Sequence, residues 1–547
     1  MIILSVKKIK RIILFLLVLL LFYTRLVNLS WGLPYPFHPD ERNMANAIQQ
    51  LHCETSNLKE CLNPHFFAYG QFPLYLGYGM VRVYKFFRGE LLKSISFEEA
   101  TLALRLISSF ASVLLVYFVV KVVQMLNKIQ KDSLSFFASL LIFIFSPALI
   151  QFAHFGTTES LLMLFYIWLV YESLSLMNKK ITLGSFLLIT SVISGLAIAT
   201  KVSSLIFMAI PVLMVFYYHK NKLYKIFKSL VLYFSLSLVV GFIFSPHNLI
   251  SFNEFLGAFH YESAVALGTL PVFYTRQFAG TIPIIFQFLK IFPYALGWSV
   301  LIFFIVGFFA LPLNKQNNLL RFSFLVYFLP NAFLYAKWTR FMSPVMPIMI
   351  VITVLLLLRA FKNVNNFRKV VGAILVLSFI IPGVAYLSVY AHPDIRFTAS
   401  DWINRNIQRD SIILSETGNV VDIPLTNINN YQIFSFNFYD LDENKQLQLD
   451  LSQNLEKASY IFIPSRRIFM NHSKEKYPLL REYYSKLSSD SLGFKKIAEF
   501  AAYPKISFLG QTLLKFPDEN AEETWSVFDH PVIRIYHRTK SVGDGGL

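Results

Sequence analysis

The chain has 547 residues, of which 55% are hydrophobic and only 15% charged, and its formal net charge is +18 at pH 7. This composition excludes an ordinary soluble protein, and long continuous apolar runs favour a bundle of membrane helices over a β-barrel. Membrane proteins collect Lys and Arg in their cytoplasmic loops, so the positive charge is explained without a nucleic-acid partner, and we expect none.

The first predicted membrane helix covers residues 12–27. It follows a basic segment at residues 7–11, and no run of small residues typical of a cleavage site comes after it. Because basic residues usually stay on the cytoplasmic side, we predict an uncleaved helix whose N-terminus lies in the cytoplasm.

Further apolar runs bring the number of predicted membrane helices to about eleven. The others cover residues 101–125, 134–152, 159–177, 181–199, 202–218, 229–246, 283–311, 321–336, 342–359 and 370–390. Lys and Arg residues gather in every second loop, which agrees with this alternation across a cell membrane. The odd number of helices predicts a multi-pass membrane domain at residues 1–390 and an extracytoplasmic domain at residues 391–547.

The first predicted outer loop, residues 28–100, contains an acidic pair and both cysteines of the chain. Asp40 and Glu41 follow a proline at the start of a helical segment. An acid there can act as a general base, bind a divalent cation or stabilise the helix N-terminus. Cys53 and Cys61 can form a disulfide in an oxidising compartment, and a free pair agrees equally well with the sequence.

A second polar cluster joins two predicted helices on the same side, at residues 154–160. Helix capping by its threonines explains part of this pattern but does not explain the histidine. We interpret Glu159 as a second acid or, together with Asp40, as a metal ligand. We interpret His154 as a donor to an anion or substrate.

Basic residues also occur on the predicted outer side, where they are disfavoured. Lys337 and Arg340 lie between two helices, and Lys201 follows another. Binding of a lipid phosphate would explain basic residues on this side, and snorkelling toward lipid headgroups explains them equally well.

A second long outer loop at residues 247–282 is polar and aromatic. It suits a platform for a sugar or an acceptor, for which the candidate residues are His247, His260, Tyr274 and Arg276. The C-terminal segment changes character, because strand-like runs at residues 411–414, 460–463 and 532–536 alternate with helix-like stretches at 398–408 and 475–487. This pattern predicts a small α/β domain without a nucleotide-binding motif.

With these motifs in place, the chain resembles the GT-C membrane glycosyltransferases, and among them the protein O-mannosyltransferases and the bacterial aminoarabinose and Rgt-type transferases. The resemblance extends over essentially the whole chain. It is carried by residues 37–41, 154–160, 337–340, 399–403 and 523–531. It implies an all-α polytopic membrane bundle with a small extracytoplasmic α/β domain.

The resemblance also implies a chemistry: an inverting transfer of a sugar from a polyprenyl phosphate to an acceptor hydroxyl. Asp40 matches the position of the family's catalytic acid and would take the proton of the acceptor, with Glu41 beside it. Arg340 or Lys337 would hold the departing phosphate. Some relatives use a divalent metal ion and others do not, and the acids here are compatible with either.

The acceptor implied by the resemblance is a lipid, glycan or protein of the cell envelope. The loop at residues 247–282 has no room for the β-trefoil insertion of the protein O-mannosyltransferases, which favours a lipid or glycan. A transporter or flippase for lipid-linked sugars is the alternative from another class. No two-fold repeat is visible, and the ionisable groups gather at helix ends on one side, so the enzyme is favoured over the transporter. An anchored binding protein would not explain so many membrane helices.

Overall fold

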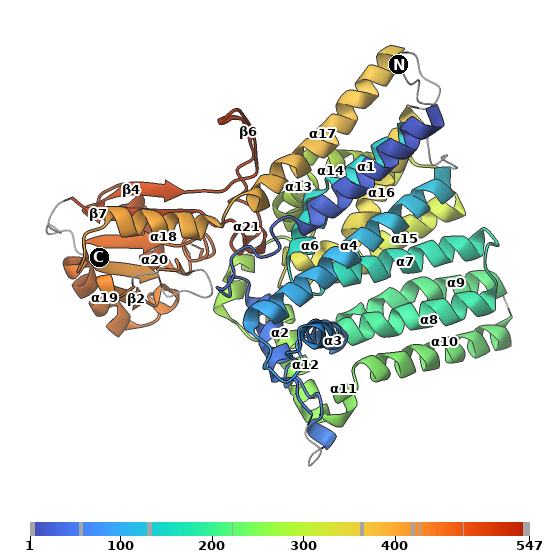
Figure 1. The fold of residues 1–547 in the computed structure, drawn as a ribbon, viewed down its shortest axis with the longest axis horizontal. Helices are drawn as coiled ribbons and strands as arrows, with labels where there is room; N and C mark the ends of the chain where they lie inside the picture. Colours follow the sequence, from blue (N-terminus) through green and yellow to red (C-terminus); the bar gives the residue numbers. More distant parts are fainter. Residues whose placement is uncertain are drawn as a thin grey trace.

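A bundle of long helices with a small α/β domain at one end forms the molecule (Figure 1). The computed structural model describes residues 6–53, 58–127, 134–220, 222–361, 366–416, 422–425, 428–473 and 475–539. Helix α1 (Val6–Leu26) begins at the end of the bundle that is far from the α/β domain.

Within the described ranges, seven helices are long and apolar enough to cross a membrane, and nine spans result if each of two bent pairs counts as one. The seven are α4 (Phe97–Asn127), α7 (Glu159–Met177), α8 (Leu183–Thr200), η2 with α9 (Val202–His219), α10 (Leu223–Phe244), η5 with α16 (Thr339–Ala360), and α17 (Asn366–Ala391). These spans confirm a polytopic helical membrane bundle.

Two of the eleven predicted spans correspond to helices that are not apolar enough to be counted with these seven. They are α1 (Val6–Leu26), which carries several basic residues near its start, and α15 (Lys315–Ala332), which contains polar side chains. Both lie alongside the other helices of the bundle (Figure 1).

The predicted span at residues 283–311 is present, but it is not one continuous helix. The segment forms the short helices η4 (Gln287–Ile291) and α13 (Phe292–Leu296), and then α14 (Trp298–Ala310) after a bend of 115°. The bend falls at Gly297, whose φ of +84° lies outside the range that other residues readily adopt. A single glycine therefore redirects a largely apolar segment.

The predicted helix at residues 134–152 is also divided, into α5 (Leu134–Ile144) and α6 (Pro147–His154), which meet at 49°. Pro147 has no backbone N–H, so carbonyl groups at the end of α5 lose helical partners. The buried Arg25 of α1 donates to two of them, Phe143 O at 3.1 Å and Ile144 O at 2.9 Å. This arrangement explains an arginine inside the bundle without an acidic partner.

The α/β domain contains a five-stranded sheet in the order β2-β1-β3-β7-β4. Strand β1 (Ile412–Glu416) runs parallel to β2 (Gln432–Phe436) and β3 (Tyr460–Ile463), whereas β7 (Ile533–Arg538) is antiparallel to β3 and β4 (Phe494–Phe500). The predicted strand-like runs correspond to β1, β3 and β7.

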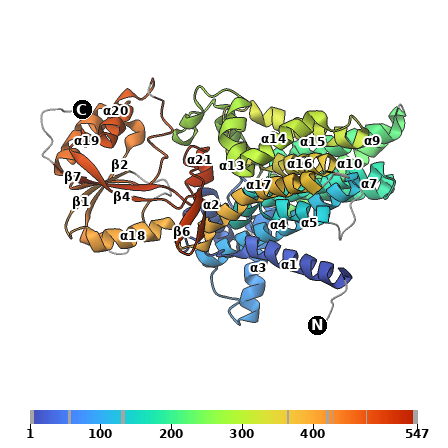
Figure 2. The ribbon, with the colours of Figure 1, turned by 90° about the horizontal axis from the view of Figure 1, so that it is seen from above.

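Helices cover both faces of this sheet (Figure 2). Helix α18 (Ile395–Asn406) packs on one face through Ile403, and α19 (Lys445–Lys457) and α20 (Pro478–Ser488) pack on the other. The predicted helical stretches correspond to α18 and α20, and the predicted domain boundary at residue 390 falls at the end of α17. The sheet thus forms the middle layer of a three-layer domain.

Candidate active site

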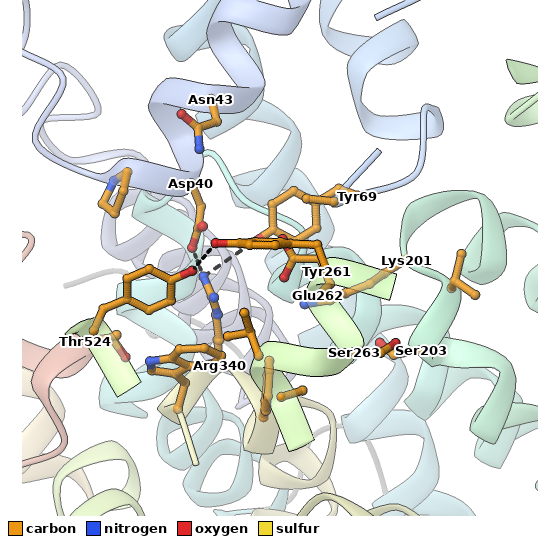
Figure 3. Close-up of a pocket in the computed structure, with 18 of the residues that line it drawn as sticks. Asp40, Asn43, Tyr69, Lys201, Ser203, Tyr261, Glu262, Ser263, Arg340 and Thr524 are labelled. Atoms are coloured by element: carbon orange, nitrogen blue, oxygen red, sulfur yellow. Dashed lines mark hydrogen bonds and ion pairs between the residues drawn. The ribbon is translucent and has the colours of Figure 1, made fainter. Parts of the chain in front are cut away.

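A cavity of about 610 Å³ lies at the end of the bundle that faces the α/β domain. Its walls come from the start of α2 (Pro39–Gln50), the loop before α3 (Phe72–Phe87), η2, α12 (Phe252–Leu267), η5 and the C-terminal domain. Segments far apart in the sequence therefore meet around one space. Figure 3 shows the side chains that line it.

Asp40 and Arg340 point toward each other in this cavity and form an ion pair between Oδ2 and Nη1 (Figure 3). Asp40 occupies the first turn of α2, and His38 caps that helix by accepting from the backbone N–H of Glu41 at 3.4 Å. The guanidinium of Arg340 also lies over the ring of Trp338, 4.7 Å from its centroid. A carboxylate and a guanidinium thus share the cavity, and both side chains stay about one-fifth exposed.

Glu41 does not face the cavity. Its two oxygens accept from Nε and Nη2 of Arg105 at 2.8 and 2.6 Å, and it also accepts from the backbone N–H of Gly156 at 2.7 Å. Arg105 donates further to the carbonyl groups of Leu29 and Trp31. The buried pair therefore joins α2 to α4 and to the loop before α7, and this geometry favours a structural role for Glu41 over the predicted catalytic one.

Lys201 lines the cavity at the end of α8, and Glu262 of α12 lines it as well. The Lys201 ammonium lies 4.9 Å from the ring centroid of Tyr69 and 5.4 Å from that of Phe341. Burial raises the pKa of Glu262, and the charge of Lys201 partly opposes this shift. Lys201 and Arg340 are thus two cations in one cavity, which suits an anionic ligand.

The predicted residues of the 154–160 cluster lie outside the cavity lining. His154 is fully buried, its two ring nitrogens pair with the carbonyl groups of Ile150 and Val27 at 2.8 Å, and its ring stacks on Tyr390. Glu159 is buried at the start of α7, and the preceding threonine makes no side-chain cap. The structure therefore gives His154 a packing role and does not bring Glu159 into the cavity with Asp40.

The residues present do not fit a bound metal ion. Among the described residues, no group of three or more His, Cys, Asp or Glu side chains could hold one. The carboxylate of Asp40 is already paired with Arg340, and Glu159 is not among the residues that line the cavity. A divalent cation normally requires several oxygen ligands, so we derive no step through the predicted metal at Asp40 and Glu159.

Lys337 is buried, and its ammonium donates to the carbonyl of Tyr335 at 3.0 Å instead of entering the cavity. Within the second long loop, Tyr274 lines the cavity and its hydroxyl lies 2.9 Å from that of Tyr261. His260 is exposed and does not line the cavity. Of these predicted residues, only Tyr274 is positioned to meet a ligand.

Arg276 connects the loop to the C-terminal domain. Its guanidinium donates to the carbonyl of Tyr439 and lies 3.5 Å from a carboxylate oxygen of Asp440 and 3.3 Å from Nε2 of His472. These contacts hold the α/β domain against the loop that forms one cavity wall. Arg276 therefore acts in this structure as a connection between domains.

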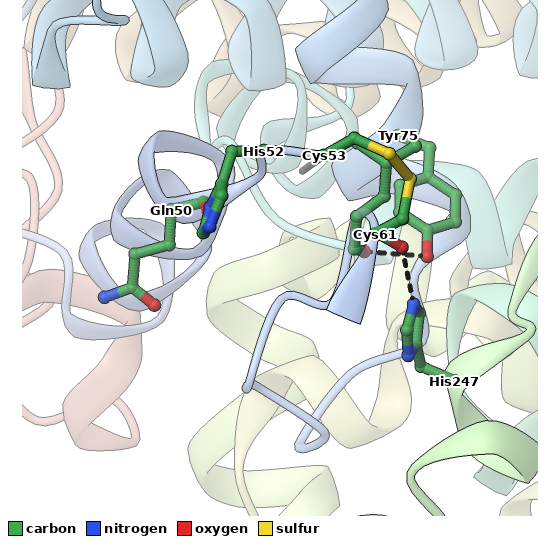
Figure 4. Close-up of a disulfide and its surroundings, with 7 residues drawn as sticks. Gln50, His52, Cys53, Cys61, Tyr75 and His247 are labelled. Atoms are coloured by element: carbon green, nitrogen blue, oxygen red, sulfur yellow. Dashed lines mark hydrogen bonds between the residues drawn. A yellow bond between two sulfur atoms is a disulfide. The ribbon is translucent and has the colours of Figure 1, made fainter. Parts of the chain in front are cut away.

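Cys53 and Cys61 form a disulfide with an S–S distance of 1.94 Å (Figure 4). Of the two alternatives that the sequence left open, the structure therefore contains the bonded pair. The carbonyl of Cys61 pairs with Nε2 of His247 at 2.9 Å, and Nδ1 of His247 lies 3.2 Å from the hydroxyl of Ser251. His247 begins α11 (His247–Ile250), which leads directly into α12. The disulfide loop thus anchors the helix that forms a cavity wall.

Replacing Cys53 and Cys61 together with Ser is expected to lower the free energy of unfolding by about 2–3 kcal/mol, because a closed loop of this size restricts the unfolded chain by that amount. We also expect the lost anchor to reduce ligand binding in the cavity. Thermal unfolding in detergent, with and without a reducing agent, measures the first effect. Wild type in reducing agent should match the double variant, and a wild type that is insensitive to reduction would contradict this role.

The C-terminal domain contributes groups that the sequence analysis did not identify as site residues. Glu522 accepts from the backbone N–H and the hydroxyl of Thr339 at 2.9 and 2.8 Å, directly before Arg340. Phe528 packs on the His38 ring with centroids 4.6 Å apart. One short segment, around α21 (Glu523–Ser526), therefore contacts a residue close to Asp40 and the residue directly before Arg340.

A buried charged group holds this segment to the bundle. His530 pairs with Asp518 at 2.8 Å and with Asp529 at 2.5 Å, while Asp529 accepts from the hydroxyls of Tyr386 and Tyr390 of α17 at 3.0 and 2.8 Å. Burial lowers the pKa of His530, but the two carboxylates outweigh burial and raise it to about 10. The histidine is therefore charged at neutral pH.

This charge predicts a pH-dependent stability. The ordinary pKa of histidine is 6.5, so the stabilisation is fully present below pH 6.5 and is lost as the pH rises toward 10. His530→Gln leaves two buried carboxylates without their cation, and we expect a loss of about 3 kcal/mol near pH 6. Unfolding temperatures of wild type and variant should converge as the pH rises. A difference that stays constant up to pH 10 would contradict the assignment.

None of the known protein-family models matches the sequence, and no curated protein has a significantly similar sequence. Solved structures are similar in fold. The archaeal oligosaccharyltransferase AglB from Archaeoglobus fulgidus, in complex with an inhibitory peptide and a dolichol-phosphate, matches with a TM-score of 0.50 and 12% identity, over 87% of this chain and 72% of that chain.

An Archaeoglobus fulgidus oligosaccharyltransferase in the apo form also matches with a TM-score of 0.50, at 11% identity over 97% of this chain and 88% of that chain. The chain has the GT-C fold. ArnT from Cupriavidus metallidurans in the apo state has a TM-score of 0.44 and 12% identity, over 96% of this chain and 97% of that chain. The predicted fold class is confirmed, and at these identities the likeness concerns the GT-C fold alone.

Proposed function

We propose that this multi-pass membrane protein is an inverting glycosyltransferase, which moves a sugar from a polyprenyl phosphate to an acceptor hydroxyl. The observation that carries the proposal is the Asp40–Arg340 pair in a cavity at the end of a GT-C bundle, with Lys201 lining the same cavity. The matched AglB complex contains a dolichol-phosphate and an inhibitory peptide, which supports a donor bound through a lipid phosphate.

Asp40 is the proposed general base. Its carboxylate takes the proton of the acceptor hydroxyl while the acceptor oxygen forms a bond to the anomeric carbon, and the bond between that carbon and the phosphate oxygen breaks on the opposite side. One displacement of this kind inverts the configuration. The phosphate leaves as a stable anion, so the reaction needs no general acid.

Arg340 and Lys201 are the proposed partners of the departing phosphate. Arg340 forms an ion pair with Asp40, and a bound phosphate would compete for the same guanidinium. Charge-assisted hydrogen bonds aimed at the developing negative charge lower the barrier. Tyr261, Tyr274 and Trp338 supply an aromatic wall on which a sugar ring can pack.

We further propose that the cavity and residues 391–547 lie on the extracytoplasmic side. Basic residues of α1 and of the turns after α7 and α9 lie at the opposite end of the bundle (Figure 1). Because basic residues favour the cytoplasmic side, this distribution supports the proposed orientation. The disulfide beside the cavity agrees with an oxidising compartment.

For the acceptor, we propose a lipid or glycan of the cell envelope. The outer loop at residues 247–282 is short for an inserted domain. It consists mainly of α11, α12 and η3 (Phe273–Phe278) and contains no separate folded module. Glu523 and Thr524 of the C-terminal domain also line the cavity, which limits the size of the part of the acceptor that fits inside.

The proposal is tested with purified protein in proteoliposomes and a panel of polyprenyl-phosphate sugars that carry a radioactive sugar. Lipid, glycan and protein fractions of envelope extracts serve as acceptors. Transfer into the lipid or glycan fraction, with equal release of polyprenyl phosphate, is the expected result. Movement of intact lipid-linked sugar across the bilayer without release would contradict the enzyme and favour the flippase.

Lys201→Met is expected to lower kcat/KM for the lipid donor by about tenfold to a hundredfold, because a charged contact to phosphate contributes about 1.5–3 kcal/mol. Lys201→Arg should restore much of the activity. Lys180→Met, at the opposite end of the bundle between α7 and α8, is the matched control and should behave as wild type. Initial rates over a range of donor concentrations decide, and equal losses in the Lys201 and Lys180 variants would contradict a specific role.

A further inference from the structure

A β-hairpin projects from the junction of the two domains. It consists of β5 (Lys505–Phe508) and β6 (Gln511–Lys515), which pair with each other and with no other described strand. In Figure 1 it extends beside the outer end of α17, away from the five-stranded sheet. An isolated two-stranded hairpin is only marginally stable in water, so its apolar side needs a partner.

The hairpin is amphipathic. Directly opposed residues share a face, and successive residues alternate between the faces. One face carries the pairs Lys505–Lys515 and Ser507–Thr512, and the other carries the pairs Ile506–Leu514 and Phe508–Gln511. A register shift between Ile506 and Ser507 leaves Leu513 with no opposed residue in β5. Phe508, two residues after Ile506, lies on the apolar face. Basic and hydroxyl groups are therefore separated from branched and aromatic side chains.

The apolar side chains of the hairpin are exposed. Phe508 is 65% exposed, Leu513 62% and Leu514 46%, and Leu509 at the tip is 87% exposed. Leu509 has a φ of +48°, and the next residue is Gly510 with a φ of +81°. Turns of this kind usually take asparagine or aspartate before glycine. A leucine there is poorly suited to water.

The root of the hairpin lies at the end of a membrane span. The backbone N–H of Lys505 donates to the hydroxyl of Ser388 at 3.0 Å, close to Ala391, where α17 ends. Most residues in the apolar part of α17 are not buried against the rest of the protein, as expected for a helix that faces lipid. The hairpin therefore leaves the protein at the depth where the hydrocarbon gives way to headgroups. The Lys515 ammonium lies over the ring of Tyr503 at this level.

We propose that residues 505–515 form a membrane-interface anchor, whose apolar face enters the leaflet on the side of the α/β domain. Lys505 and Lys515 lie on the opposite face, toward lipid phosphates. The surface continues the lipid-facing side of α17, and this continuity favours the bilayer over a protein partner. The anchor fixes the height of the C-terminal domain above the membrane, and it does not depend on glycosyl transfer.

The full chain in lipid nanodiscs provides the test. Phe508→Cys is labelled with an environment-sensitive fluorophore, with Leu449→Cys as the control, because Phe508 is 65% exposed on the apolar face and Leu449 is 61% exposed on α19 in the distal domain. We expect the label at position 508 to be quenched several-fold more by lipids with a nitroxide near the headgroup, and less by aqueous iodide, than the label at 449. Equal quenching by iodide, or protection from both quenchers by protein, would overturn the proposal.

A second measurement avoids the label, which could itself favour lipid. Hydrogen exchange is compared in nanodiscs for unlabelled wild type and the variant with Leu513→Asn and Leu514→Asn. The expected result is faster exchange in residues 505–515 of the variant and unchanged exchange in the five-stranded sheet. Identical exchange of the hairpin in both proteins would show that the bilayer does not stabilise it.

Discussion

Replacing Asp40 with Asn is expected to reduce sugar transfer at least about a hundredfold, within the range for loss of a general base. Asparagine keeps the size of the side chain but neither accepts a proton at neutral pH nor forms an ion pair with Arg340. The donor should still bind, because the cation that faces its phosphate is no longer neutralised. Initial rates of polyprenyl phosphate release at saturating donor measure the effect.

The control for Asp40→Asn is Asn43→Ala, one turn further along α2 and also on the cavity wall. It should change the rate far less, since it removes no charge. Comparable losses in both variants would indicate that α2 was disturbed as a whole. Unchanged turnover in Asp40→Asn would sink the assignment of the base.

Replacing Arg105 with Met is expected to destabilise the folded protein by about 3–5 kcal/mol, because Glu41 remains as a buried charge without its partner. The two side chains are 2% and 3% exposed, so water cannot replace the lost contacts. The unfolding temperature in detergent and the yield of monodisperse protein measure this loss.

The double variant Arg105→Met with Glu41→Met distinguishes a structural pair from a catalytic acid. Replacing both charges with apolar groups removes the buried ion, so much of the lost stability should return. Transfer activity should recover with it, reduced only by the loss of the contacts to Leu29 and Trp31. A stable double variant without activity would restore Glu41 to the catalytic role that the sequence predicted.

Much of the bundle was predictable, because continuous apolar runs and basic loops determine which segments cross a membrane and in which direction. The break at Gly297 was not, since an apolar run looks the same on either side of a glycine. The helix α15 was predicted from the apolar residues 321–336, and in the structure it begins earlier, with a polar first turn at Lys315.

Within the site, the sequence identified Asp40 and Arg340 but not their pairing, which joins residues 300 positions apart. It treated Glu41 as equivalent to Asp40, although neighbours on a helix point in directions about 100° apart. This angle predicts that only one of the two neighbouring acids can face the cavity. The sequence contains no such indication for Glu522, because the role of this residue depends on how the C-terminal domain packs beside Thr339.

The configuration of the product tests the central claim most directly. Proteoliposomes receive a polyprenyl-phosphate sugar labelled with ¹³C at its anomeric carbon, and NMR follows donor and product for wild type and Asp40→Asn. We predict release of polyprenyl phosphate with an inverted anomeric centre in wild type, and neither signal in the variant. A product that retains the configuration of the donor, or undiminished turnover by Asp40→Asn, would contradict a single displacement assisted by Asp40.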